Sequence, residues 1–209
     1  MSLHLLIGLI GLLYIVVFGV MALLRREGLS IRFAVESVCL TAIAVILVWL
    51  TPIQIHPVLF LLLMYILTLR VRIMVDLANV FARRGKYAQA ERIYDLASHL
   101  WPDQTSDLII KTNHAISLLQ NNQLGESISM FTDVLSQAKQ GYLGVKYEAA
   151  AHFNLGVAYL RNNNNSMATI EFNSVLDTWP ASLYARRAQE ALQRQRAKIT
   201  SQDQNKPAE

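Results

Sequence analysis

Charged side chains are scarce in this sequence, and they are unevenly distributed. They make up 16% of its 209 residues, against about a quarter in a typical soluble domain. Residues 1–69 hold only five of them, namely Arg25, Arg26, Glu27, Arg32 and Glu36, and the other 29 lie after residue 69. This distribution excludes one uniform soluble domain and predicts a lipid-embedded part before a water-exposed part. The later part mixes basic and acidic residues, so a nucleic-acid partner is not expected.

Cysteine pairs and the common catalytic motifs are also missing. The single cysteine, Cys39, lies in an apolar stretch, which excludes a disulfide framework and a cysteine-based metal site. The sequence has no phosphate-binding glycine loop, no HExxH and no GxSxG. We therefore expect no enzyme activity, no metal and no cofactor. The default interpretation of His114 and His152 is packing within a helix pair.

Three apolar segments near the N-terminus are candidates for membrane spans. Residues 3–24 carry no charge, and a helix of that length is about 33 Å long, enough to cross a bilayer. Residues 33–50 form a second candidate, with Glu36 in the first turn, where a carboxylate can reach the headgroups. The third segment, 53–69, is short, and a re-entrant or interfacial helix is the alternative to a full span.

The arginines indicate the orientation of these segments. The loop between the first two carries Arg25, Arg26 and Arg32, the next loop has no Lys or Arg, and basic residues resume at Arg70. Positively charged loops stay in the cytoplasm, so the pattern predicts three crossings, an outside N-terminus and a cytoplasmic C-terminal part. We expect an integral protein, for example of a bacterial cytoplasmic membrane.

The connection to the water-exposed part contains no helix-breaking residue. Val58 to Arg84 has neither proline nor glycine, and its apolar residues continue across Arg70. The sequence therefore predicts one continuous helix over this range, which would link the last apolar segment rigidly to the water-exposed part.

After residue 70 the pattern changes to paired amphipathic helices that recur at intervals of 34–41 residues, which indicates a helical solenoid. The predicted units are 71–104, 108–141 and 149–182, with a polar capping helix at 182–198 and a disordered tail at 199–209. Each unit carries small and aromatic residues at matching positions. These are Met74, Leu77, Ala78, Phe81, Gly85, Tyr87, Ala90, Tyr94, Ala97 and Pro102; then Ala115, Leu118, Leu124, Ser127, Phe131 and Val134; then Leu155, Gly156, Tyr159, Ala168, Phe172 and Pro180.

These positions resemble the tetratricopeptide repeat family over residues 71–198. The resemblance implies an all-α fold, in which N-terminal membrane helices precede an α-solenoid of about three helix-turn-helix repeats and a capping helix. In the family, the first helix of each repeat lines a groove that binds peptides. Mapped onto this sequence, the groove positions are Arg72, Val75, Asn79, Arg83, Ile109, Thr112, Asn113, Ile116, Gln120, Ala150, Phe153, Asn154, Val157 and Arg161.

The groove positions depart from those of the chaperone-binding members of the family. Asn79 and Asn113 stand where those members hold the peptide backbone. Val75, Ala150 and Asn154 replace the basic residues that bind a C-terminal carboxylate, so we do not expect that ligand. An asparagine amide can still both donate to and accept from a peptide backbone.

The sequence supports two classes of function. The first is an adaptor that binds a partner protein or peptide at the cytoplasmic face of a membrane. The alternative is a structural subunit or assembly factor of a larger membrane complex, in which the membrane helices make the essential contacts. Three spans are more than an anchor needs, and Gly8 and Gly11 would allow another helix to approach closely. The partners expected are thus the lipid bilayer, a protein or peptide ligand and other membrane-protein subunits.

Overall fold

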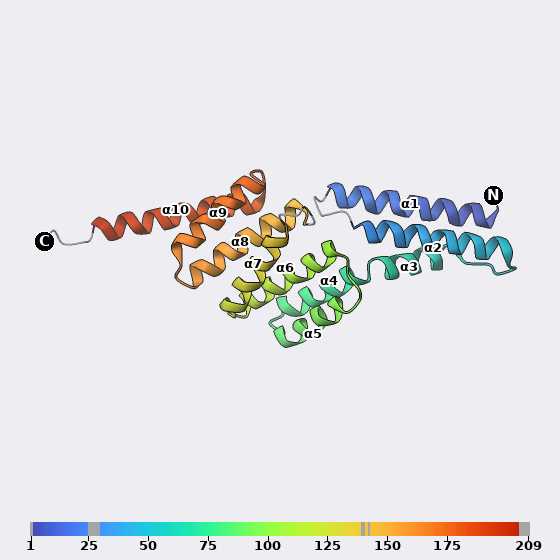
Figure 1. Cartoon of the computed structure of the whole chain (residues 1–209), viewed down its shortest axis with the longest axis horizontal. Coiled ribbons are helices and arrows are strands. Elements are labelled where there is room, and N and C mark those ends of the chain that lie inside the picture. Colours follow the sequence, from blue (N-terminus) through green and yellow to red (C-terminus); the bar gives the residue numbers. More distant parts are fainter. Residues whose placement is uncertain (1, 25–29, 139–140, 142, 205–209) are drawn as a thin grey trace. The chain divides into compact units, whose positions relative to one another are not determined.

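The computed structural model describes residues 2–24, 30–138, 141 and 143–204, with side chains up to residue 198. Within these residues the secondary structure is helical, in ten helices labelled α1 to α10 (Figure 1). The chain divides into two compact units, Met1–Ile110 and Lys111–Glu209, and each is described by itself. The helix α6 (Gln104–Gln120) begins in the first unit and ends in the second.

The first unit opens with three apolar helices that pack on one another: α1 (Leu3–Leu24), α2 (Ile31–Leu50) and α3 (Pro57–Thr68). Their shared core contains Ile7, Tyr14 and Met64, each less than 5% exposed. Their outer faces are almost entirely apolar as well, with residues such as Leu12 and Leu62 more than half exposed. Figure 1 shows the three helices side by side.

Among the described residues, two helices are long and apolar enough to cross a membrane, α1 and α2. The third expected span is not confirmed as one helix. Its helical part, α3, has 12 residues, and it reaches spanning length only together with α4 (Arg70–Arg83), from which it is bent by 70°.

The prediction of one continuous helix from Val58 to Arg84 is wrong, because the helix breaks at Leu69. Leu69 has φ −107° and ψ 15°, and it caps both α3 and α4. The cause is a set of polar contacts on either side of the bend. The Thr68 hydroxyl donates to the Met64 carbonyl, 2.6 Å away, and the Arg70 guanidinium donates to the Leu67 carbonyl. In an uninterrupted helix, the Leu67 carbonyl would accept from the backbone NH four residues later.

The helices α4 to α9 form three hairpins, as the repeat pattern predicts. The first pairs α4 with α5 (Tyr87–Ser98), the second α6 with α7 (Leu124–Ala138), and the third α8 (Val145–Arg161) with α9 (Asn165–Thr178). In each hairpin a small residue on the first helix is matched twelve positions later by another, and four positions after that by a fully buried ring. The three sets are Ala78, Ala90 and Tyr94; Ala115, Ser127 and Phe131; and Gly156, Ala168 and Phe172.

The turns inside the three hairpins have one geometry. Gly85, Asn122 and Asn163 each adopt a positive φ, between 59° and 72°. In every turn the NH of the next residue donates to a carbonyl five residues back: Lys86 to Phe81, Gln123 to Leu118 and Asn164 to Tyr159. This is the hydrogen bond of a Schellman helix end, which needs a left-handed residue, and asparagine tolerates that conformation better than most residues. The three hairpins therefore share the same turn conformation and the same turn hydrogen bond.

The last helix, α10 (Leu183–Gln204), packs on the third hairpin through Ala185, Ala188 and Leu192, as expected of a capping helix. Its backbone continues beyond the predicted end at residue 198, because no proline or glycine interrupts residues 199–204. The first part of the predicted disordered tail is thus helical. Residues 205–209 lie outside the described residues.

Candidate functional site

On α4, the predicted binding positions differ in what they can offer a ligand. Val75 is only 3% exposed and belongs to the core of the first hairpin. The amide oxygen of Asn79 accepts a hydrogen bond from the Tyr94 hydroxyl, 2.6 Å away. Burial raises the pKa of the Tyr94 phenol, although Arg83 opposes that shift, so the hydroxyl keeps its proton and remains a donor. Arg83 itself is exposed, and Arg72 is half-buried.

On α6, the five predicted positions differ in how far their side chains are exposed. Ile109 packs against the core of the first hairpin, and Thr112 is fully buried. Asn113 and Ile116 are half-buried, and Gln120 is exposed at the end of the helix. Of these five side chains, that of Gln120 is therefore the most accessible to a ligand.

On α8, most of the predicted positions serve the hairpin itself. Ala150 is 4% exposed. The ring of Phe153 lies 5.9 Å from that of Phe172 and 5.7 Å from that of Tyr184, between centroids. The Asn154 side-chain NH2 donates to the Ala150 carbonyl on its own helix, and Arg161 donates to the Leu119 carbonyl over 3.0 Å.

The structure therefore reduces the number of predicted positions whose side chains can contact a partner. Val75, Thr112 and Ala150 are removed from it as contact residues, because their side chains are buried between helices. Phe153 and Val157 both pack against the core of the third hairpin. Three of the predicted positions are exposed, and they carry cationic or amide side chains: Arg83, Gln120 and Arg161. Such side chains suit a partner rich in carbonyl and carboxylate acceptors.

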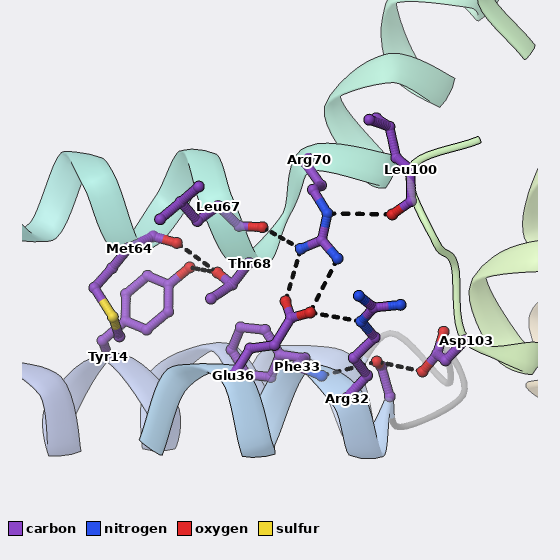
Figure 2. A network of polar contacts seen from close by, with 11 residues as sticks. Tyr14, Arg32, Phe33, Glu36, Met64, Leu67, Thr68, Arg70, Leu100 and Asp103 are labelled. Carbon is purple, nitrogen blue, oxygen red and sulfur yellow. Dashed lines mark hydrogen bonds and ion pairs between the residues drawn. The ribbon is translucent and has the colours of Figure 1, made fainter. Parts of the chain in front are cut away.

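A second group of polar residues, which the sequence analysis did not bring together, lies where α2, α3 and α4 meet (Figure 2). The Arg70 guanidinium binds both carboxylate oxygens of Glu36, at 2.7 and 2.9 Å. Arg32 donates to the same carboxylate, and Arg70 also donates to the Leu100 carbonyl, 3.3 Å away. Glu36, expected to lie within reach of the headgroups, has Arg70 as its partner within the chain.

Two more hydrogen bonds fix the same region. The Tyr14 and Thr68 hydroxyls lie 2.7 Å apart and join α1 to the end of α3. The Ser30 hydroxyl, at the start of α2, donates to the Asp103 carboxylate, whose other oxygen accepts from the backbone NH of Ser106 at the start of α6. Figure 2 shows the contact of Tyr14 with Thr68 beside the bend, and the dashed line that ends at the Asp103 carboxylate. We call Arg32, Glu36, Arg70, Ser30 and Asp103 the junction network.

We expect Arg70→Met to destabilise the junction by about 1–2 kcal/mol. The arginine and glutamate side chains are 23% and 25% exposed, so solvent screens the pair only in part, and the bidentate geometry is favourable. The change also leaves the Leu67 and Leu100 carbonyls without this donor. Spin-label distances between α2 and α4 should broaden in Arg70→Met. Arg92→Met, at an exposed arginine on α5 outside the junction network, is the control and should leave the distribution narrow. Equal distributions in both variants would show that the network does not hold the bend.

Comparisons with known proteins identify no family for this chain. No family model matches it, and no curated protein matches it. One similar solved structure is the N-terminal domain of stress-induced protein-1 (STI-1) from C. elegans, with 19% sequence identity and a TM-score of 0.49. The match covers 59% of this chain and 95% of that one. A likeness at this level assigns neither fold nor function, so the repeat assignment rests on the three hairpins and their turns.

Proposed function

We propose that this protein is a membrane-anchored adaptor whose tetratricopeptide-type repeats bind a partner protein or peptide at the cytoplasmic face. The observation that carries the proposal is the presence, in one chain, of two helices long and apolar enough to cross a membrane and three hairpins with the same turn geometry. Repeats of this kind expose a row of first helices that can bind another chain.

The outer surface of α1 to α3 supports the membrane part of the proposal. Leu5, Leu9, Val38, Ile46 and Leu59 are each about half exposed or more. Because about half of each side chain is already buried, covering the rest with an apolar medium contributes about 0.8–1.5 kcal/mol per side chain. A surface made of many of them is stable only when lipid or protein covers it. The three-crossing topology stays part of this proposal. It needs α3 and residues 53–56 to cross together, with the junction network at the cytoplasmic interface.

A specific observation also favours the alternative, a structural subunit or assembly factor of a membrane complex. The helices α1 to α3 form a packed unit with its own core and an interhelical hydrogen bond, Tyr14 to Thr68. One unpacked helix would be enough for an anchor. A packed three-helix unit offers a defined surface to another membrane subunit.

A charge-reversal pair tests the adaptor proposal. Arg83 lies on α4 among the predicted contact positions, whereas Arg92 lies on α5, the second helix of the same hairpin. We expect Arg83→Glu to reduce the partner recovered with the detergent-solubilised protein by roughly tenfold, the effect of losing an interface contact of about 1.4 kcal/mol. Arg92→Glu should recover it unchanged.

The alternative predicts a different pattern in the same purification. If the partners bind through the membrane helices, both arginine variants recover them equally. Replacing residues 1–68 by one unrelated membrane helix then abolishes recovery. That combination of results would contradict the adaptor proposal.

A further inference from the structure

The loop between α5 and α6 contains an exposed tryptophan in an uncommon conformation. Trp101 is 77% exposed and has φ 48°. Residues other than glycine rarely adopt a positive φ, and an outlier of this kind is a reason to look for a function. A large aromatic ring presented to water is also unusual, because tryptophan buries more apolar surface than most side chains.

The third hairpin provides an internal comparison. Trp179 stands before Pro180 as Trp101 stands before Pro102, at the corresponding point of the repeat. Trp179 has φ −150° and packs against the core of its own hairpin, half-buried. The same Trp-Pro sequence can therefore fold inward. The outward direction of Trp101 is a property of the first repeat and not of the motif.

What distinguishes the first repeat is the junction network, which holds the loop on both sides of Trp101. The Leu100 carbonyl accepts from Arg70 at the bend, and Asp103 accepts from Ser30 at the start of α2. Figure 2 shows the contact of Arg70 with Leu100 and the dashed line to Asp103, near the end of α3 and the start of α2. Consecutive Cα atoms are about 3.8 Å apart, so Trp101 is fixed close to the level at which the apolar helices end.

That level is the expected headgroup region of the membrane. Charged side chains gather there, namely Arg32, Glu36 and Arg70. At the other end of α2, the exposed Trp49 lies in the last turn. Tryptophan is enriched at both interfaces of a bilayer, where its ring suits the boundary between headgroups and acyl chains. Trp49 and Trp101 would mark the two interfaces.

We propose that Trp101 inserts into the cytoplasmic headgroup layer and gives the first repeat its own contact with the lipid surface. The inference rests on the membrane embedding in the proposed function. It adds a second point of attachment, on the repeat region itself, which sets the orientation of α4 to the membrane. The two hydrogen bonds of its loop hold the exposed Trp101 ring at the level of the headgroups.

Tryptophan fluorescence of the full chain in vesicles tests this directly, because the sequence has only three tryptophans. Three variants each keep one of them and carry phenylalanine at the other two positions. They are reconstituted in phosphatidylcholine–phosphatidylglycerol vesicles, with and without lipids brominated in the upper acyl chain. Bromine quenches only rings at the lipid boundary, and iodide in the buffer quenches only rings in water.

We expect Trp101 to lose intensity to brominated lipid about as strongly as Trp49, to emit at shorter wavelength than an exposed indole, and to resist iodide. Trp179 should keep the same intensity with and without brominated lipid. If the variant that keeps only Trp101 does not fold, the difference between Trp49→Phe and Trp49→Phe/Trp101→Phe gives the same signal.

The other outcomes distinguish an error in the lipid contact of Trp101 from an error in the membrane embedding. If brominated lipid quenches Trp49 while iodide quenches Trp101, the lipid contact of the first repeat is wrong and the membrane embedding stands. If brominated lipid quenches neither, both are wrong. Equal lipid quenching of all three tryptophans would mean non-specific adsorption to the vesicle and would also overturn the assignment to Trp101.

Discussion

Replacing Gly156 by leucine should lower the free energy of unfolding of the third hairpin by about 2–4 kcal/mol. A Cβ atom at this position would lie 2.7 and 2.8 Å from two ring carbons of Phe172. The Phe172 ring is fully buried and packs within the core of the third hairpin. A larger side chain must push α8 and α9 apart, and overpacking of this kind is costly.

Gly125 is the matched control for this variant, because it is also a helical glycine of the second unit. A Cβ there would meet nothing within 4 Å, so Gly125→Ala should leave stability unchanged or raise it by roughly 0.5 kcal/mol through helix propensity. Thermal unfolding of both variants, monitored by far-UV circular dichroism, measures the difference. Equal melting temperatures would mean that α8 and α9 do not pack at this distance.

Gly11→Leu should separate α1 from α2, at a cost of about 2–3 kcal/mol. A Cβ at Gly11 would overlap the side chain of Thr41, whose hydroxyl is already bonded to the Ser37 carbonyl of its own helix. From the sequence, a close approach of another helix was predicted at Gly8 and Gly11. The structure shows such an approach at Gly11, where the contact is tightest.

The yield of an engineered disulfide between α1 and α2 measures this separation. A Cβ at Gly8 would lie 3.6 Å from the Val45 side chain, so Gly8→Cys and Val45→Cys in a Cys39→Ala background should cross-link readily. Adding Gly11→Leu should reduce the yield several-fold. Adding Gly19→Leu should not, because nothing lies within 4 Å of a Cβ there. Unchanged cross-linking in the Gly11→Leu protein would show that the two helices are not in contact there.

The repeats were predictable because they depend on local side-chain size. Small residues such as Ala78 and Ala90 recur at a fixed offset, and the helices can interlock only where both are small. Asparagine tolerates the left-handed conformation that such a turn needs, and Asn163 adopts it in the turn after α8. The corresponding role of Asn122 has the same chemical basis.

The bend at Leu69 was not predictable from local sequence, because no residue near it breaks a helix. It depends on contacts between segments far apart in the chain, such as Arg70 with Glu36. One indication of this contact was present in the sequence, which was that Glu36 and Arg70 lie at the ends of two apolar segments.

The exposure of individual side chains was not predictable for a similar reason. The burial of Val75, Thr112 and Ala150 depends on how helices pack and not on a residue's place in a repeat. The outward Trp101 has the same sequence context as the inward Trp179, so the difference between them lies in tertiary contacts.

The central claim is that apolar helices anchor a repeat region on the cytoplasmic side of a membrane. The most direct test is the position and brightness of a fluorescent protein fused after Glu209 and expressed in bacteria, using a fluorophore that matures only in the cytoplasm. The proposed topology places an outside N-terminus and three crossings before the repeats, so the fusion should be bright and confined to the cell membrane. Diffuse fluorescence would contradict the anchor. A dark fusion, together with an active periplasmic reporter at the same position, would contradict the cytoplasmic placement.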